Sequence, residues 1–134
     1  MGLFSGKRPA DLGVRNGSLK APSPSPNAVS SQASGGYHQI APLTYQGTPE
    51  QAMKALRTII EGTPNTRIVE TRPDYLYAEY TSTLIGFVDD VEFYFPPNAK
   101  IIHVRSASRL GHSDLGVNRK RVESIRARLA QSGA

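Results

Sequence analysis

Four β-type runs follow one another between residues 66 and 106, and the turns between them are too short to hold a helix. The runs cover Thr66–Thr71, Tyr75–Thr83, Phe87–Phe95 and Lys100–Ser106. Pro73 and Pro96 mark turns between them. Because parallel neighbours need a crossover of a dozen or more residues, we expect these runs to pair antiparallel. A weaker run around Ile40 and Leu43 is a candidate fifth strand.

One helix is predicted before these runs. Thr48 is a typical N-cap, Pro49 suits the first helical position, and Gln51 completes a capping box. The helix is expected to end at Gly62. Its apolar face repeats at helical spacing through Ala52, Met53, Leu56, Ile59 and Ile60.

A second helix is predicted after the runs, beginning at Asp114 or Asn118 and continuing to about Ala130. Its apolar stripe is formed by Leu115, Val122, Ile125 and Leu129. We therefore predict an α+β fold, with an antiparallel sheet of four to five strands and two helices packed on one face.

The N-terminal part of the chain has a different composition. Ala21–Asn27 has proline at every second position, which favours extended backbone. We predict that residues 1–25 form a flexible or extended arm and that residues 26–134 form a single α+β domain. The length of 134 residues suits one domain with its own core.

Several kinds of chemistry are disfavoured by the composition. The chain has no cysteine, so disulfides, thiolate ligands and a cysteine nucleophile are excluded. Its three histidines lack metal-ligand spacing, and no Walker A or G-x-S-x-G motif is present. We therefore expect no metal and no cofactor. No secretory signal and no run of about 18 apolar residues is visible, so we expect a soluble, cytoplasmic protein without a transmembrane segment.

Positive charge is concentrated at the C-terminal end. The net charge is +5, and residues 101–134 contain seven basic and two acidic residues. This favours an anionic partner, either a small molecule or an acidic protein surface, although the same charge could neutralise the acidic middle of the chain. Nucleic acid is an unlikely partner, because the aromatic residues cluster in that acidic middle rather than among the basic residues. The oligomeric state is not indicated.

The segment Ile101–Arg121 contains the densest group of candidate ligand-binding residues. We predict that Arg105, Arg109 and Arg119 contact the anion, with hydrogen bonds from Ser106, Ser108 and Asn118. An alternative is a small hydrolase-like enzyme in which His112 or Asp114 acts as base. The leading prediction is a non-enzymatic binding or assembly module.

Acidic residues are predicted to pair with these arginines. Strand alternation places Asp89 on the core side with Val91 and Phe93, where an unpaired charge is costly. Arg105, Arg109 and Arg119 are its candidate partners. Structural ion pairing is predicted for Asp89, Asp90, Glu92, Asp114 and Glu123, with Asp90 and Glu92 on the opposite face of the strand from Asp89.

Four stretches resemble a known family. They are PNAVSSQA (Pro26–Ala33), DYLYAEYTS (Asp74–Ser82), GFVDDVEF (Gly86–Phe93) and VRSASRLGHSDLGVNRKRVESIR (Val104–Arg126). Together they resemble the domain of unknown function 1499 family. The resemblance implies no particular activity, and it makes a bacterial or plastid-related origin plausible. The family commonly has cysteine where this chain has Ala28, so a thiol function of that position is excluded here.

Overall fold

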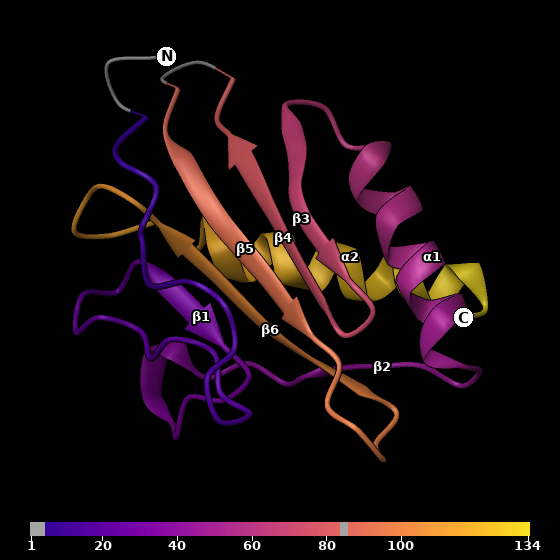
Figure 1. Ribbon diagram of the computed structural model, residues 1–134. Helices are drawn as coiled ribbons and strands as arrows, with labels where there is room; N and C mark the ends of the chain where they lie inside the picture. Colours follow the sequence, from indigo (N-terminus) through magenta and orange to yellow (C-terminus); the bar gives the residue numbers. More distant parts are fainter. Residues whose placement is uncertain (1–4, 84–85) are drawn as a thin grey trace.

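The centre of the protein is one antiparallel sheet (Figure 1). The structure is a computed structural model that describes residues 5–83 and 86–134. The four predicted runs form its long strands, β3 (Thr66–Arg72), β4 (Tyr75–Thr81), β5 (Val88–Tyr94) and β6 (Ile101–Ser108). Each pairs antiparallel with the next in the chain, as the short turns predict.

Two short strands bring the sheet to six strands, where four to five were predicted. Both β1 (Ala28–Ser30) and β2 (Leu43–Thr44) pair antiparallel with β6, and the 3₁₀ turn η1 (Gly36–His38) lies between them. The main strand order is β1-β6-β5-β4-β3. Strand β1 has only three residues, too few for an alternating apolar pattern to be recognised. The sequence therefore does not indicate this additional strand.

Helix α1 (Pro49–Glu61) begins and ends as predicted. The Thr48 side chain accepts a hydrogen bond from the Gln51 amide at 3.1 Å, and the Gln51 side chain accepts one from the Thr48 amide at 3.0 Å. These reciprocal bonds satisfy two N–H groups that the first turn leaves without a helical partner. Gly62 is the C-cap.

Helix α2 (Val117–Ser132) begins between the two predicted starts. Val122, Ile125 and Leu129 are buried, as the predicted stripe requires. Leu115 was wrongly included in that stripe, because its side chain is 86% exposed. It precedes the helix and has a positive φ of 53°, so helical spacing does not apply to it.

Both helices cover one face of the sheet, which confirms the predicted α+β architecture (Figure 1). Alternate side chains of β4, β5 and β6 point toward the helices, and they form the main core with the buried sides of α1 and α2. The largest fully buried apolar members from these three strands are Phe93, Leu76, Ile102, Val91 and Val104.

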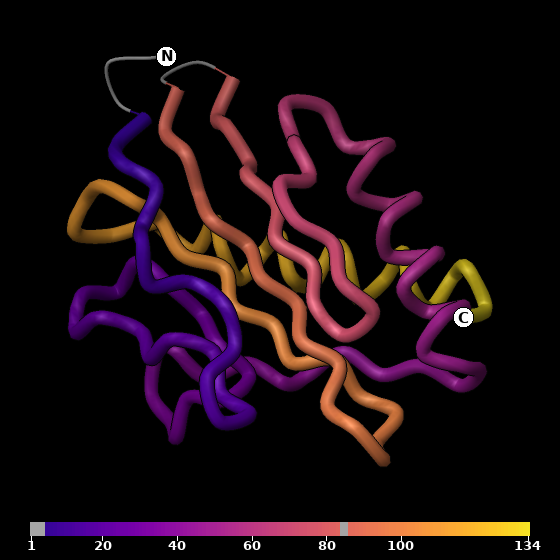
Figure 2. The backbone as a smooth tube through the Cα atoms, in the orientation of Figure 1, coloured from indigo at the N-terminus to yellow at the C-terminus, as the bar shows by residue number. Residues whose placement is uncertain are grey.

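The N-terminal segment crosses the other face of the sheet. Figure 2 shows residues 5–25, in indigo, passing over the strands on the side away from the helices. We call this segment the N-terminal arm. Its Leu12, Val14 and Leu19 pack with Tyr75, Tyr77 and Tyr94 in a second apolar cluster. The arm lies on the domain and makes a tight turn between Arg15 and Ser18. The prediction of a flexible or extended arm that ends at residue 25 stays a prediction. Residues 1–4 of the predicted arm lie outside the described residues.

Neither helix of the described part of the chain has the length and apolar character needed to cross a membrane.

Replacing Thr48 by alanine is expected to lower the free energy of unfolding by about 1 kcal/mol, because the Gln51 amide in the first turn of α1 loses its capping partner. Urea denaturation followed by circular dichroism measures the change. Thr58→Ala is the matched control, since its hydroxyl only bonds back to the Lys54 carbonyl within the same helix. An equal loss in both variants would contradict the capping role.

Candidate functional site

Strand β5 carries three acidic side chains that are all buried. Alternation directs Asp89 toward the helices and directs Asp90 and Glu92 toward the N-terminal arm. Because burying a charge without a partner is costly, each carboxylate requires a cation or several hydrogen-bond donors. The partners come from different parts of the chain, and they define where the predicted site residues lie.

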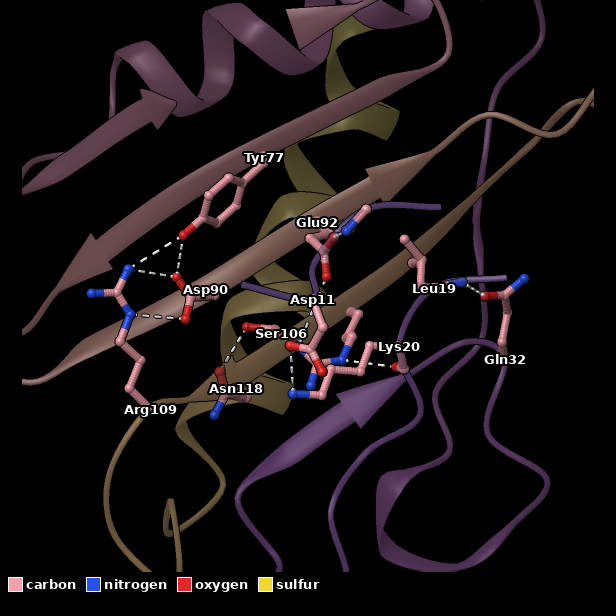
Figure 3. A network of polar contacts seen from close by, with 12 residues as sticks. Asp11, Leu19, Lys20, Gln32, Tyr77, Asp90, Glu92, Ser106, Arg109 and Asn118 are labelled. Atoms are coloured by element: carbon pink, nitrogen blue, oxygen red, sulfur yellow. Dashed lines mark hydrogen bonds and ion pairs between the residues drawn. The ribbon is translucent and has the colours of Figure 1, made fainter. Parts of the chain in front are cut away.

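Asp90 is paired with Arg109 on the arm side of the sheet (Figure 3). Arg109 donates from Nε to Asp90 Oδ2 at 2.9 Å and from Nη2 to Oδ1 at 2.8 Å, a bidentate arrangement. Hydrogen bonding to Asp90 is the main reason that the pKa of Arg109 is raised. The Tyr77 hydroxyl also donates to Asp90, and burial together with this bond raises the pKa of Tyr77.

Glu79 connects this pair to the arm. It forms ion pairs with Arg109 and with Arg8 of the arm, whose Nη2 lies 2.8 Å from Glu79 Oε2. Burial acts to raise the pKa of Glu79, but hydrogen bonds from Arg8 and Arg109 outweigh it, so the pKa lies below its ordinary value of 4.5. The carboxylate therefore holds the arm to the sheet in its charged form.

Glu92 is fully buried beneath the arm. Its Oε2 accepts hydrogen bonds from the Gly13 amide at 2.6 Å and from the Tyr75 hydroxyl at 2.5 Å. Its Oε1 lies 3.8 Å from Nη1 of Arg105 and has no hydrogen-bond partner. Arg105 donates from Nε to the Lys20 carbonyl of the arm at 2.9 Å, and burial lowers its pKa.

On the helix side, Asp89 pairs with Arg121, with Arg121 Nη2 at 2.8 Å from Asp89 Oδ2. None of the three predicted partners occupies this position. Arg119 is two residues before Arg121, about 200° around the helix, so the two side chains point in different directions. Arg119 instead donates to the carbonyls of Tyr37 and Gln39. Glu123, also predicted to be paired, contacts Arg126 at 2.9 Å on the exposed side of α2.

Asn118 is fully buried and joins the remaining predicted residues. Its Oδ1 accepts from the Ser106 hydroxyl at 2.6 Å, and its Nδ2 donates to Ser108 Oγ at 3.0 Å and to Asp114 Oδ2 at 2.8 Å. Asp114 also accepts from the amide of Gly116 at 2.9 Å, which helps to cap α2. Burial acts to raise the pKa of Asp114, but hydrogen bonds from Tyr37 and Asn118 outweigh it, so the pKa lies below its ordinary value.

The six predicted ligand-binding residues therefore lie in three places. Arg105 and Arg109 are buried under the arm, Arg119 lies beside the η1 turn, and the other three surround the start of α2. Asp114 serves as a hydrogen-bond acceptor at the start of α2, and the exposed His112 has no hydrogen bond within the described residues. Within the described residues, the only serine–histidine hydrogen bond joins Ser31 Oγ and His103 Nδ1, which lie 3.0 Å apart.

A cavity of about 470 Å³ opens where β5 begins and β6 ends, beside the start of α2. We call it the end cavity. Its polar lining includes Asp89, Ser108, Asp114 and Arg121. Among the described residues five large apolar side chains are exposed, and four of them line this cavity: Phe87, Leu110, Leu115 and Val117. An apolar lining with a few polar groups and this volume is typical of small-molecule sites.

Leu115 lies at the mouth of the end cavity in an unfavourable backbone conformation. Four described residues other than glycine have positive φ, and three are asparagines, which tolerate it. Leu115 is the exception, and such a conformation costs about 1–3 kcal/mol. Its side chain is 86% exposed, so burial does not compensate this cost. Because Leu115 was predicted to lie in the apolar stripe of the helix, its exposure beside the cavity was not predicted. The adjacent Gly116 indicates that the helix begins after Leu115.

Over the described residues, no three histidine, cysteine, aspartate or glutamate side chains gather in a way that could hold a metal ion. The carboxylates of the site are instead close to arginines.

Comparison with protein families gives one match. The model of a family described as a protein of unknown function, DUF1499, matches residues 18–129, which is most of the chain. No curated protein matches the sequence.

Glu79→Gln is expected to lower the free energy of unfolding by about 1–3 kcal/mol at pH 7, because Arg8 and Arg109 lose a charged acceptor. A lowered pKa stabilises the fold above the unfolded value near 4.5, and this contribution disappears as the pH falls through the folded value. The difference between the two proteins should therefore shrink between pH 5 and pH 3.

Urea unfolding of both proteins across this pH range measures the effect. Glu61→Gln is the control, because Glu61 forms only an exposed pair with Arg57 at 3.7 Å and should have little effect at any pH. A Glu79→Gln difference that stays constant with pH would refute the ionic contribution.

Proposed function

The chain belongs to the DUF1499 family of proteins of unknown function, and we propose that it is a binding module whose ligand places an apolar group in the end cavity. The observation that carries this proposal is the gathering of exposed apolar side chains at one hollow, with Leu115 held at positive φ beside it. A fold tolerates an unfavourable residue most readily where function requires it.

The polar lining gives this site its orientation. Arg121 forms an ion pair with Asp89. It also donates hydrogen bonds to Ser106 Oγ at 3.1 Å and to Asn118 Oδ1 at 2.8 Å. Its guanidinium also lies 4.6 Å from the centre of the Tyr80 ring. Side chains with this many contacts are pre-organised, so a ligand meets a rigid polar floor formed by Asp89 and Arg121. Beside this floor lie the four exposed apolar side chains of the lining, which we call the apolar rim.

Anion binding by Arg105, Arg109 and Arg119 stays a prediction. An anion at these residues would compete with Glu92, with Asp90 and with the Tyr37 carbonyl, respectively. A hydrolase using His112 or Asp114 also stays a prediction. Within residues 5–83 and 86–134, His112 has no hydrogen bond to a nucleophile. Both alternatives have less structural support than binding of an apolar group in the end cavity.

Leu115→Gly is expected to weaken binding of the neutral dye Nile red at least about fivefold, because the apolar rim loses its most exposed member. The same variant should gain about 1 kcal/mol of unfolding free energy, since glycine adopts positive φ without strain. Fluorescence titration and urea denaturation measure the two effects.

Asn65→Gly is the matched control, because Asn65 is exposed and has a positive φ of 59° but does not line the cavity. It should leave dye binding unchanged. The proposal fails if the protein does not bind the dye saturably, or if Leu115→Gly and Asn65→Gly bind it as tightly as the unaltered protein does.

A further inference from the structure

The charges lining the end cavity indicate the chemistry of the ligand's polar end. Asp89, Asp114 and Arg121 are the charged side chains in its lining, so the formal balance is one negative charge. The Arg121 guanidinium is shared among Asp89, Ser106 and Asn118. The positive charge at the cavity floor is thus already compensated by protein groups.

Asp89 keeps unused acceptor capacity. Its Oδ2 contacts Arg121 at 2.8 Å, while its Oδ1 has no hydrogen bond within the described residues. A carboxylate offers about four lone-pair directions, so several of them remain available here. Oδ1 is also absent from the oxygens buried without a partner, which are Tyr80 Oη and Glu92 Oε1. Asp89 therefore reaches the cavity with an acceptor still open.

Asp114, in contrast, has its acceptors filled. Tyr37, Gly116 and Asn118 all donate to it. It contributes negative charge to the cavity but offers little further hydrogen bonding. A donor that enters the cavity is therefore directed to Asp89.

We propose that the end cavity binds a cationic amphiphile, an apolar body carrying a primary ammonium group. This inference rests on the proposed function and adds the polar end of the ligand. The ammonium donates to Asp89 Oδ1, and the apolar body lies against Leu110, Leu115 and Val117. Charge-assisted hydrogen bonds are roughly twice as strong as neutral ones, which favours an ammonium over a hydroxyl. A carboxylate ligand would instead be repelled by Asp89 and Asp114, which outnumber the single arginine of the lining.

The protein's net charge of +5 does not oppose this. Charges on distant surfaces are screened beyond roughly 8 Å at physiological ionic strength, so the groups in the cavity decide which ligand binds.

The test uses three probes that share an octyl tail: octylammonium, 1-octanol and nonanoate. Each is titrated into the ¹⁵N-labelled full chain, and the amide shifts of Ser108, Leu110 and Leu115 give the dissociation constant. Octylammonium is expected to bind about tenfold more tightly than nonanoate, with octanol between them.

Asp89→Asn should bring octylammonium and octanol to within about twofold of each other. Glu123→Gln is the matched control, because it removes the same charge from the exposed side of α2 and should keep the preference. The comparison of the three probes on the unaltered protein decides the question even if Asp89→Asn does not fold.

The outcomes separate this inference from the function on which it rests. If none of the three probes shifts the cavity amides, both proposals are overturned. If all three bind equally, or if nonanoate binds most tightly, the cavity is a binding site but the ammonium inference is wrong.

Discussion

Burial of strand β5 on both faces is the constraint on which the rest of the structure depends. All seven of its residues are buried, and three of them are acidic. Each carboxylate meets an arginine from outside the strand: Asp89 meets Arg121 from α2, Asp90 meets Arg109 from just after β6, and Glu92 meets Arg105 from β6. The ion pairs therefore attach a helix, a loop and a neighbouring strand to one central element. Mispairing any of them would leave a charge in the interior without compensation.

Much of this fold is predictable from the sequence because its signals are local. The capping box at Thr48, the turn prolines and the alternation in β5 each involve residues within a few positions of one another. Strand β2 lies in the candidate run around Ile40 and Leu43, although only Leu43 and Thr44 pair with β6. Strand β1 is not predictable in this way, because the residues around Val29 become a strand only by pairing with β6. The path of the arm depends likewise on distant partners, such as Glu79 for Arg8.

The candidate site is likewise predictable only where its signals are local. The density of polar groups between Arg105 and Arg121 correctly indicates a region with many contacts. Which arginine meets Asp89 depends on where α2 begins, and a shift of two residues changes the answer. The apolar residues of the end cavity were the harder part, because Leu115 fits the helical spacing of Val122 and is separated from the helix only by the left-handed Gly116. Exposure is a property of the folded chain, and the spacing of residues does not contain it.

The contact between Gly13 and Glu92 gives the arm a built-in reporter. The Gly13 amide donates its proton to a carboxylate oxygen of a fully buried residue, 79 positions later in the chain. That proton exchanges with solvent only when the arm lifts from the sheet, whereas the amides of β5 are held in ladders on both sides. The ratio of the two exchange rates therefore separates local opening of the arm from unfolding of the whole domain. A single backbone hydrogen bond thus makes the stability of the arm measurable on its own.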